Sequence, residues 1–521
     1  MSITIIGAGL AGLSAALTLA EQGFASNLVS AQASERAQSV MAEGGINACL
    51  NTMDEDDTVE NHFEDTMRGG VYLADPNAVQ GLCTHAPEIV RKFYALGVPF
   101  PTNENGIIQR NFGGQKKKRT AFVKSSTGKM LMTALIDEVR KYEAKGLVTR
   151  YPHHRLGSLA IHENNCSGAV IIDTYSRQRT VLSGGVILAS GGMSGLFDGL
   201  TTGTTQNTAE TAALCLEQGV ALANLEFIQY HPTTIGISGK RLLISEAARG
   251  EGGRLFVRRN GTPWYFMEEK YPELKNLMPR DVVSAEMVTV TAMSDCEKQV
   301  YLDMTGIDKT VWKSRLSDLR EQCIHYLDID PVKQPIPVSP GIHYFMGGIW
   351  VDEQHRTSAK YLYAAGEGAC QYHGANRLGG NSLLGAVYGG QTAARTVISE
   401  MNPSLRATDD DVAYTEVSPR FRAAVSAVLG KYLKILREET ELREAIRVLQ
   451  ELQPQNDAEE RLLRLAEATA KSALFRTESR GAHRRTDYPE TDASWQQQTV
   501  VILRDNELCI TRRKLPERRT S

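Results

Sequence analysis

The stretch SITIIGAGLAG, residues 2–12, decides the fold of this chain. An apolar strand, Ser2 to Ile6, runs directly into a GxGxxG turn, and LSAALTLAEQG then reads as a helix that ends at Gly23. The glycines of such a turn permit a tight bend, close approach of a pyrophosphate, and close packing of helix on strand. They are Gly7, Gly9 and Gly12. The pattern predicts a Rossmann-like α/β domain that binds a dinucleotide, with a purely structural glycine turn as the alternative.

The end of the second strand indicates which dinucleotide is bound. SNLVS ends at Ser30, where an NAD-binding domain usually carries an acidic residue for the ribose. Two further glycine-rich turns, ASGGMSG (189–195, with Gly191) and AAGEGA (364–369), each follow an apolar strand. Together these features favour a flavoprotein in which FAD lies extended across the sheet.

Composition narrows the class of protein. The chain has 521 residues, a formal net charge of -3 and 42% hydrophobic residues, so nucleic acid is not an expected partner. Its 8 cysteines are scattered without ligand-like spacing, and we expect neither a metal nor an iron-sulfur cluster in this chain. The first strand begins within one residue of the start, and no run reaches the apolar length of a membrane span. These features predict a cytoplasmic protein.

Changes of pattern divide the chain. We predict the first part of the FAD-binding domain at 1–225, an inserted α+β second lobe at 226–345, and the second part of the FAD-binding domain at 346–405. A C-terminal helical domain follows at 406–485, opened by the N-cap pair Ser418-Pro419. The tail, 486–521, reads as a hairpin that turns at Asp505-Asn506.

Polar residues gather in a few glycine-rich or apolar stretches: QYHPTT, LLISEAARGEGG, MPRDVVS, PGIHYFMGGI and HGANRLGGNSLL. Singly, each has an ordinary structural explanation, such as a core histidine or an Arg280–Asp281 ion pair that caps a helix. As a set they suit a small dicarboxylate, because arginine forks bind carboxylates in bidentate fashion. The candidates are His231, Ser245, Glu246, Arg249, Arg280, His343 and Arg377.

Over nearly its whole length the chain resembles the flavoprotein subunit of the fumarate reductase/succinate dehydrogenase family, which also contains L-aspartate oxidase. The resemblance rests on long motifs in order: AEGGINA, FGGQKKKRT, EFIQYHPT, EAARGEGGRLF, PRDVVS, HYFMGGI, GEGACQYHGANRLGGNSLL and ESRGAHRRTDYPE. It implies reduction of fumarate to succinate, with hydride from flavin N5.

The resemblance also implies that the lobe at 226–345 is a capping domain that carries the substrate site, and it implies roles for matching positions. His343 and Arg377 would hold one carboxylate, while His231 and Ser245 would hold the other. Arg280 would deliver the proton, and Glu246 with Arg249 would form its proton path. Glu367 would bind FAD, and the turn Asn381, Ser382 and Leu383 would touch the flavin ring.

Phe112 bears on which member of the family the chain is. L-aspartate oxidases carry a glutamate at this position, suited to the substrate ammonium, whereas an apolar wall fits fumarate or succinate. Two features favour the oxidase instead: the EAARGEG motif, and the lack of a residue that could bond FAD covalently. The alternatives are therefore an L-aspartate oxidase, a reductase of another unsaturated acid, or a non-catalytic assembly flavoprotein.

The loop RAQSVMAEGGINACL, residues 36–50, has neither a helix nor a strand pattern and resembles the flavin-contacting loop of the family. Counting back from Gly44-Gly45, Gln38 occupies the place of the histidine that commonly bonds FAD covalently. Ser39 can add a hydrogen bond to the flavin. We therefore predict non-covalent FAD, which favours fumarate reduction over succinate oxidation.

Partners follow from the missing cluster cysteines. Electrons must come from outside this chain, and we expect an iron-sulfur subunit, with membrane anchor subunits that could hold the protein at the inner face of the cell membrane. A diffusible reduced flavin is the alternative donor. The basic tail could be a docking surface or a solvated terminus; its residues are Arg512, Arg513, Lys514, Arg518 and Arg519.

Overall fold

A computed structural model describes residues 2–237, 239–408 and 414–519 of the chain. The outermost ends of the predicted domains, residue 1 and residues 520–521, and the stretch 409–413 within the predicted helical domain lie outside the described residues. The domain boundaries stay a prediction, and the elements below are those that the structure shows.

A five-stranded parallel sheet forms the nucleotide-binding layer, in the order β21-β12-β1-β2-β8. Its strands are β1 (Ile3–Ile6), β2 (Ser26–Ser30), β8 (Val148–Pro152), β12 (Val186–Leu188) and β21 (Leu362–Ala364). The strand–turn–helix prediction is confirmed, because β1 leads into α1 (Leu10–Glu21). The sheet joins segments more than 300 residues apart, and it places the second glycine turn, after β12, between the first and the third.

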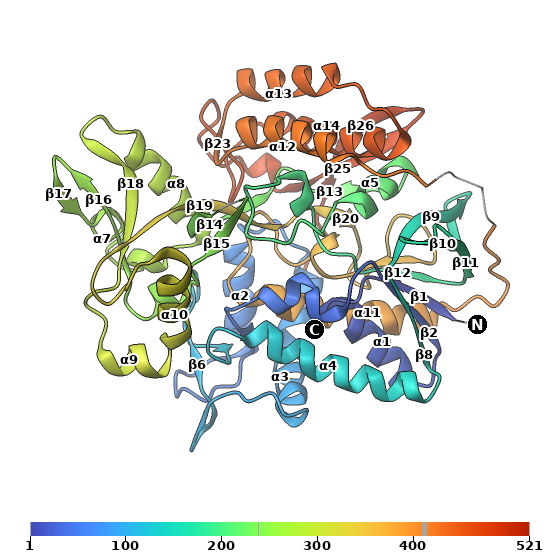
Figure 1. Ribbon diagram of the computed structural model, residues 1–521, viewed down its shortest axis with the longest axis horizontal. Helices are drawn as coiled ribbons and strands as arrows, with labels where there is room; N and C mark the ends of the chain where they lie inside the picture. Colours follow the sequence, from blue (N-terminus) through green and yellow to red (C-terminus); the bar gives the residue numbers. More distant parts are fainter. Residues whose placement is uncertain (1, 238, 409–413, 520–521) are drawn as a thin grey trace.

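Helices α1, α4 (Thr127–Ala144) and α11 (Asn381–Ser399) lie against one face of this sheet (Figure 1). Helix α3 (Pro76–Ala95) packs on α11, and α2 (Val59–Gly69) packs on α3. Helix α3 begins at Pro76, with Asp75 accepting hydrogen bonds from two backbone N–H groups of its first turn. Its apolar side chains face the core, including Val79, Leu82 and Phe93, as their helical spacing predicts.

An antiparallel three-stranded sheet is inserted between β8 and β12 in the chain. It consists of β9 (His154–His162), β10 (Asn165–Asp173) and β11 (Arg179–Ser183).

A separate lobe, at the left of Figure 1, is built on a six-stranded sheet in the order β15-β14-β19-β18-β16-β17. Its strands are β14 (Ile228–Ile237), β15 (Lys240–Leu243), β16 (Arg254–Arg259), β17 (Thr262–Trp264), β18 (Cys296–Asp303) and β19 (Ile336–Phe345). Its helices are α6 (Ala247–Gly250), α7 (Phe266–Lys270), α8 (Arg280–Ala292), α9 (Lys309–Ser314) and α10 (Ser317–Leu327). The lobe has its own core, and β14 and β19 connect it to the rest of the molecule. We call it the capping lobe.

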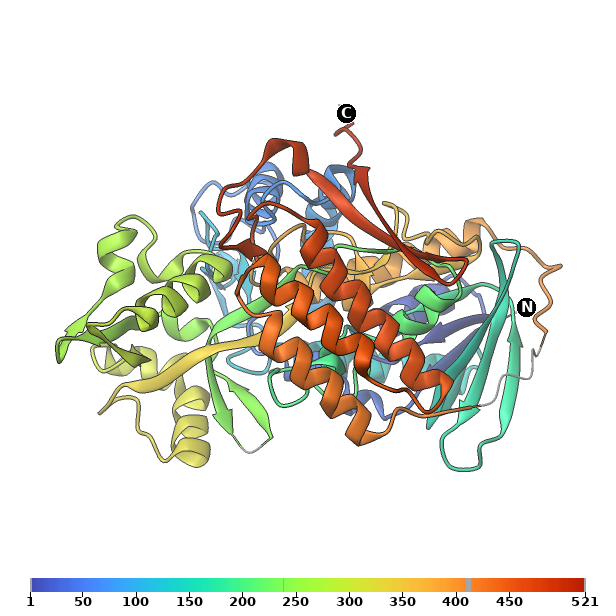
Figure 2. The ribbon, with the colours of Figure 1, turned by 90° about the horizontal axis from the view of Figure 1, so that it is seen from above.

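Three helices side by side form the C-terminal region (Figure 2). They are α12 (Pro419–Tyr432), α13 (Glu439–Glu451) and α14 (Asp457–Phe475), and Ser418 caps α12 as predicted. The predicted hairpin is confirmed as β25 (Gln497–Arg504) and β26 (Glu507–Lys514). It joins a sheet with β13 (Leu222–Ala223), β20 (Gly348–Trp350) and β22 (Ala369–Cys370), next to α5 (Glu210–Glu217).

The flavin-contacting loop differs from its prediction as a segment without regular structure. It contains two single 3-10 turns, Ser34–Arg36 and Gln38–Met41, and a short strand β3 (Ile46–Asn47) that pairs with β7 (Thr120–Ala121). Elements of two to four residues are too short to produce a periodic pattern in sequence. Other short pairs are β6 (Gln109–Arg110) on β7, β4 (Thr102–Asn103) on β5 (Gly106–Ile107), and β23 (Leu436–Arg437) on β24 (Arg484–Arg485).

Candidate functional site

One cavity of about 760 Å³ runs from the β1–α1 turn to the root of the capping lobe. Most of the predicted cofactor-binding residues line it: Gly7, Gly9, Ser30, Gln38, Ser39, Gly44, Gly45, Gly191, Glu367, Ser382 and Leu383. All the predicted substrate residues line it as well: Phe112, His231, Ser245, His343 and Arg377, with Glu246 and Arg280. Three predicted residues lie behind its wall, namely Gly12, Asn381 and Arg249. The sequence therefore predicted two sites that the fold places in one continuous space.

The first glycine turn has the geometry of a phosphate cradle. Gly7 has φ +114°, and a Cβ there would lie 2.1 Å from the carbonyl oxygen of Ala189. A Cβ at Gly12 would lie 1.8 Å from the carbonyl oxygen of Gly7, so Gly12 serves packing of α1 against the turn. Helix α1 starts after Gly9 without a side-chain cap, so its N-terminus can serve an anion.

Two side chains of the flavin-contacting loop are held by backbone groups. Gln38 Oε1 accepts from Thr204 N at 2.6 Å, and Ser39 Oγ accepts from Leu10 N at 3.2 Å. The paired glycines serve two purposes: a Cβ at Gly44 would lie 2.9 Å from the ring of Phe112, whereas Gly45 has φ +144°. The loop thus connects the first turn of α1 to the substrate wall.

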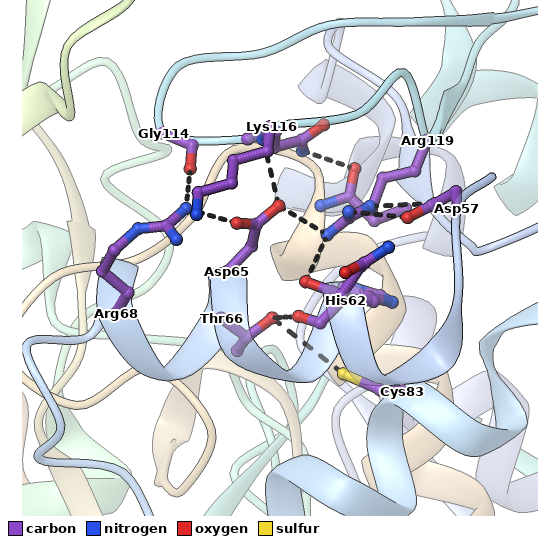
Figure 3. A network of polar contacts seen from close by, with 12 residues as sticks. Asp57, His62, Asp65, Thr66, Arg68, Cys83, Gly114, Lys116 and Arg119 are labelled. Carbon is purple, nitrogen blue, oxygen red and sulfur yellow. Dashed lines mark hydrogen bonds and ion pairs between the residues drawn. The ribbon is translucent and has the colours of Figure 1, made fainter. Parts of the chain in front are cut away.

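A buried polar network supports the turn at the start of α11. Asn381 Oδ1 accepts from Asn47 Nδ2 at 2.7 Å and lies 3.1 Å from His62 Nε2. The adjacent Arg119 lies between Asp57 and Asp65, at 2.8 and 2.9 Å, with no exposed side-chain surface (Figure 3). The side chain of Asn381 is therefore engaged by protein partners, and among these three residues Ser382 and Leu383 line the cavity.

Glu367 lies where the third glycine turn meets the cavity. Its Oε1 accepts from Phe345 N at 3.2 Å, and burial raises the pKa of its carboxyl to about 7. A carboxyl at this place can pair with ribose or ribityl hydroxyls. The glycine cradle, the N-terminus of α1, which has no cap from its N-cap residue Gly9, this acid and the elongated cavity all fit FAD.

Arg280, Glu246 and Arg249 form a buried chain at the other end of the cavity. Arg280 donates from Nε to Glu246 Oε2 at 3.0 Å, and Arg249 donates from Nη2 to Glu246 Oε1 at 3.0 Å. Burial opposes ionisation of Glu246, but the two guanidinium charges outweigh it and lower its pKa to about 2. The alternative of an Arg280–Asp281 pair is wrong, because Asp281 pairs with Arg484 at 3.1 Å.

Gln229 belongs to this site and was not among the sequence candidates. Its Oε1 accepts from Arg280 Nη1 at 3.1 Å and from Arg377 Nη2 at 3.0 Å, so it holds the two guanidiniums at a fixed separation. The signal that could have found it is strand periodicity, because Gln229 lies two residues before His231 on β14 and faces the same side. Arg377 also lies 4.3 Å from the ring centroid of Tyr344.

Both site histidines are neutral. Burial, followed by the charge of Arg280, holds the pKa of His231 and of His343 well below its ordinary value. The backbone N–H of Thr233 donates to Nδ1 of His231 at 3.3 Å. A neutral imidazole that accepts at Nδ1 carries its proton on Nε2, so His231 is a hydrogen-bond donor at the opposite side of its ring.

The charges of the site follow from these groups. Three guanidiniums (Arg249, Arg280 and Arg377) and one carboxylate (Glu246) leave two positive charges around neutral donors. Burial, with Arg280 next, lowers the pKa of Arg377 to about 9, so it stays protonated at neutral pH. Phe112 closes the site with an apolar face and is 1% exposed. Such a space suits a small dianion.

Comparisons with known proteins agree with this architecture. The FAD binding domain family matches residues 2–383, and the fumarate reductase flavoprotein C-terminal family matches residues 458–518. The succinate dehydrogenase flavoprotein subunit of Bacillus subtilis is 36% identical, over 96% of this chain and 93% of its own length. The L-aspartate oxidase of Pyrococcus furiosus is 35% identical, over 94% and 96% respectively.

Solved structures agree as well. A variant of FrdA from E. coli quinol fumarate reductase superposes with a TM-score of 0.88 at 26% identity, over 99% of this chain and 97% of that chain. No helix of the described residues is long and apolar enough to cross a bilayer, and none of their acidic, cysteine and histidine side chains cluster as metal ligands would. The protein is an FAD-dependent oxidoreductase, and it belongs to the family of succinate dehydrogenase and fumarate reductase flavoprotein subunits, together with L-aspartate oxidase.

Proposed function

We propose that the protein reduces fumarate to succinate. The observation that carries this proposal is the match between the two net positive charges of the site and the two negative charges of fumarate. A dianion of this size can be gripped at both ends, which aligns its double bond with the cofactor.

Each residue of the site has a role in this reaction. His343 and Arg377 bind one carboxylate, and His231 with Ser245 binds the other. Bound FAD supplies the hydride. Arg280 holds the proton that completes the second C–H bond, and its guanidinium charge stabilises negative charge that develops on the alkene. Glu246 and Arg249 return a proton to Arg280, because they form a continuous hydrogen-bonded chain with it.

L-aspartate oxidation is the second candidate function. It is supported by the P. furiosus relative and by Glu43, an acid that lines the cavity next to Gly44 and could pair with a substrate ammonium. Against it, the wall at Phe112 offers no charge, and Gly44 and Gly379 both pack against that ring. An ammonium beside this face would lack a partner.

Turnover assays separate the two. The purified protein should oxidise a reduced viologen dye when fumarate is added. Arg280→Met should lower that rate by about a hundredfold or more, because it removes the proton donor. Arg320→Met is the matched control, because Arg320 pairs with Asp330 on the exposed face of the capping lobe. No turnover with fumarate, together with oxygen-dependent turnover of L-aspartate, would contradict the proposal.

We also propose that FAD is bound without a covalent tether. Gln38 takes the tether position, its amide cannot form the bond, and its oxygen is engaged by Thr204 N. Acid precipitation should therefore release all yellow colour into the supernatant, measured by flavin absorbance. Yellow colour that stays in the pellet would overturn this prediction. An untethered flavin favours fumarate reduction as the physiological direction.

Electron supply requires a partner, for which we propose an iron-sulfur subunit. Two relatives are named as flavoprotein subunits of larger enzymes, which supports this assignment. Membrane association would then come through such partners.

The basic tail contacts the rest of the chain and is not simply a solvated terminus. Arg518 pairs with Glu60 at 2.7 Å, and Arg513 lies 4.0 Å from the ring centroid of Trp350.

A further inference from the structure

The loop of residues 201–204 contacts a substrate-binding histidine from behind. Thr202 Oγ1 lies 2.7 Å from Nδ1 of His343, and no hydrogen bond to Nε2 of that ring occurs among the described residues. His343 lines the cavity, so its free Nε2 side is available to a ligand. In the proposed reaction this ring binds a carboxylate, so the position of its proton decides whether it can donate a hydrogen bond.

Two proton arrangements are compatible with a neutral ring. In one, the Thr202 hydroxyl donates to Nδ1 and the ring presents Nε2–H to the cavity. In the other, Nδ1–H donates to Thr202, whose hydroxyl must then donate elsewhere, and the ring presents a lone pair. Among the described residues, the other acceptor within reach of the hydroxyl is Ile342 O, which lies 3.4 Å away and already accepts from Thr202 N at 2.9 Å. The 2.7 Å bond between Thr202 and His343 is present in both arrangements. Only in the first does the hydroxyl proton lie in that short bond rather than in the 3.4 Å contact, and only the first offers a carboxylate a donor.

We propose that Thr202 is a positioning residue that sets the tautomer of His343, so that Nε2–H faces the substrate carboxylate. This inference rests on the proposed function. His231 reaches the same tautomer through the backbone N–H of Thr233, a donor that no substitution short of proline removes. At His343 the donor is a side chain, which makes the tautomer open to mutation.

The loop is built to hold Thr202 in place. Thr204 N donates to Gln38 Oε1 on the flavin-contacting loop, and Gly203 N donates to Thr201 Oγ1 at 2.9 Å. Thr201 O accepts from Arg241 N of the capping lobe at 3.3 Å. Anchors on both sides keep the hydroxyl within reach of the ring, and they connect His343 to the loop that carries Gln38.

The test uses the flavin-loaded protein and three variants. Thr202→Val keeps the shape but removes the donor, and it leaves Nδ1 buried without a partner. The succinate Kd, read from the change in flavin absorbance, should rise about five- to a hundredfold. Thr202→Ser should restore the Kd to within about twofold of the wild-type value. Thr149→Val, the same change at an exposed site on the edge strand β8, outside the cavity lining, should leave it unchanged.

Ring 15N NMR of histidine-labelled protein reads the tautomer directly. We expect the proton of His343 on Nε2 in the wild type and in Thr202→Ser, and altered ring shifts in Thr202→Val. A wild-type Kd in Thr202→Val, no rescue by serine, or a proton on Nδ1 in the wild type would overturn the inference. Failure of wild-type protein to bind succinate would instead contradict the proposed function, and the ring spectrum would still decide the tautomer.

Discussion

At the scale of single residues, Glu43 is a buried carboxyl that the proposed reaction does not use. Its Oε2 has no partner among the described groups, and its Oε1 accepts only a long bond from Gln322 Nε2 at 3.5 Å. Burial raises its pKa from 4.5 to about 7, against the smaller lowering effects of Gln322 and Arg110, while Asp318 adds to the rise. In the unfolded chain the same carboxyl ionises near pH 4.5, so folding disfavours its charge.

This shift predicts a pH dependence of stability. Below pH 4.5 Glu43 is protonated in both states and carries no penalty. As the pH rises through 7, ionisation costs the folded state up to about 3 kcal/mol relative to the unfolded state. Glu43→Gln should remove that loss, seen as a flatter dependence of the urea midpoint on pH between 4.5 and 8. Glu35→Gln, at an exposed carboxylate just before the flavin-contacting loop, is the control; equal profiles for both variants would refute the assignment.

At the level of helices and strands, the sequence predicted the elements that depend on interactions between neighbouring residues. The first strand, α1, α3 and the Ser418 cap depend on alternation, helical spacing and capping chemistry within a few residues. The 3-10 turns around Gln38 were not predicted, because they are too short to show a periodic pattern of apolar residues. The strand order, with β21 next to β12, depends on contacts hundreds of residues apart, and no local pattern encodes it.

The contacts within the site also depend on residues far apart in the sequence. The residue types of a dicarboxylate site could be chosen from the sequence, and the fold places them in one cavity. The ion-pair partners could not be predicted from the sequence. Arg280 is adjacent to Asp281 in sequence, but it bonds to Glu246, which comes from another element. Gln229 and Thr202 were missed for a related reason: each acts through a partner that only the fold brings near.

Across the whole molecule, a buried polar network connects the C-terminal region to the start of β14, the strand that leads into the capping lobe. Arg476 donates from Nε to Glu226 Oε1 at 2.7 Å and from Nη1 to Glu478 Oε1 at 2.8 Å, and all three side chains have no exposed surface. Arg437 Nη1 donates to Glu226 O at 2.7 Å. Glu226 lies just before β14, the strand that carries Gln229 and His231, so this buried network fixes the base of the strand that enters the site.

Removal of Arg476 should therefore loosen both regions at once. Arg476→Met leaves Glu226 without its buried partner, which should cost about 3–5 kcal/mol of unfolding free energy. Amide hydrogen exchange should rise along β14 as well as in the C-terminal helices.

Adding Glu226→Gln to this variant should recover part of the lost stability, since it removes the uncompensated charge. Arg177→Met breaks an exposed pair with Glu416 and should cost about 1 kcal/mol or less. Faster exchange confined to the C-terminal helices would show that they do not hold β14, because a strand anchored through Glu226 has to respond when its anchor is removed.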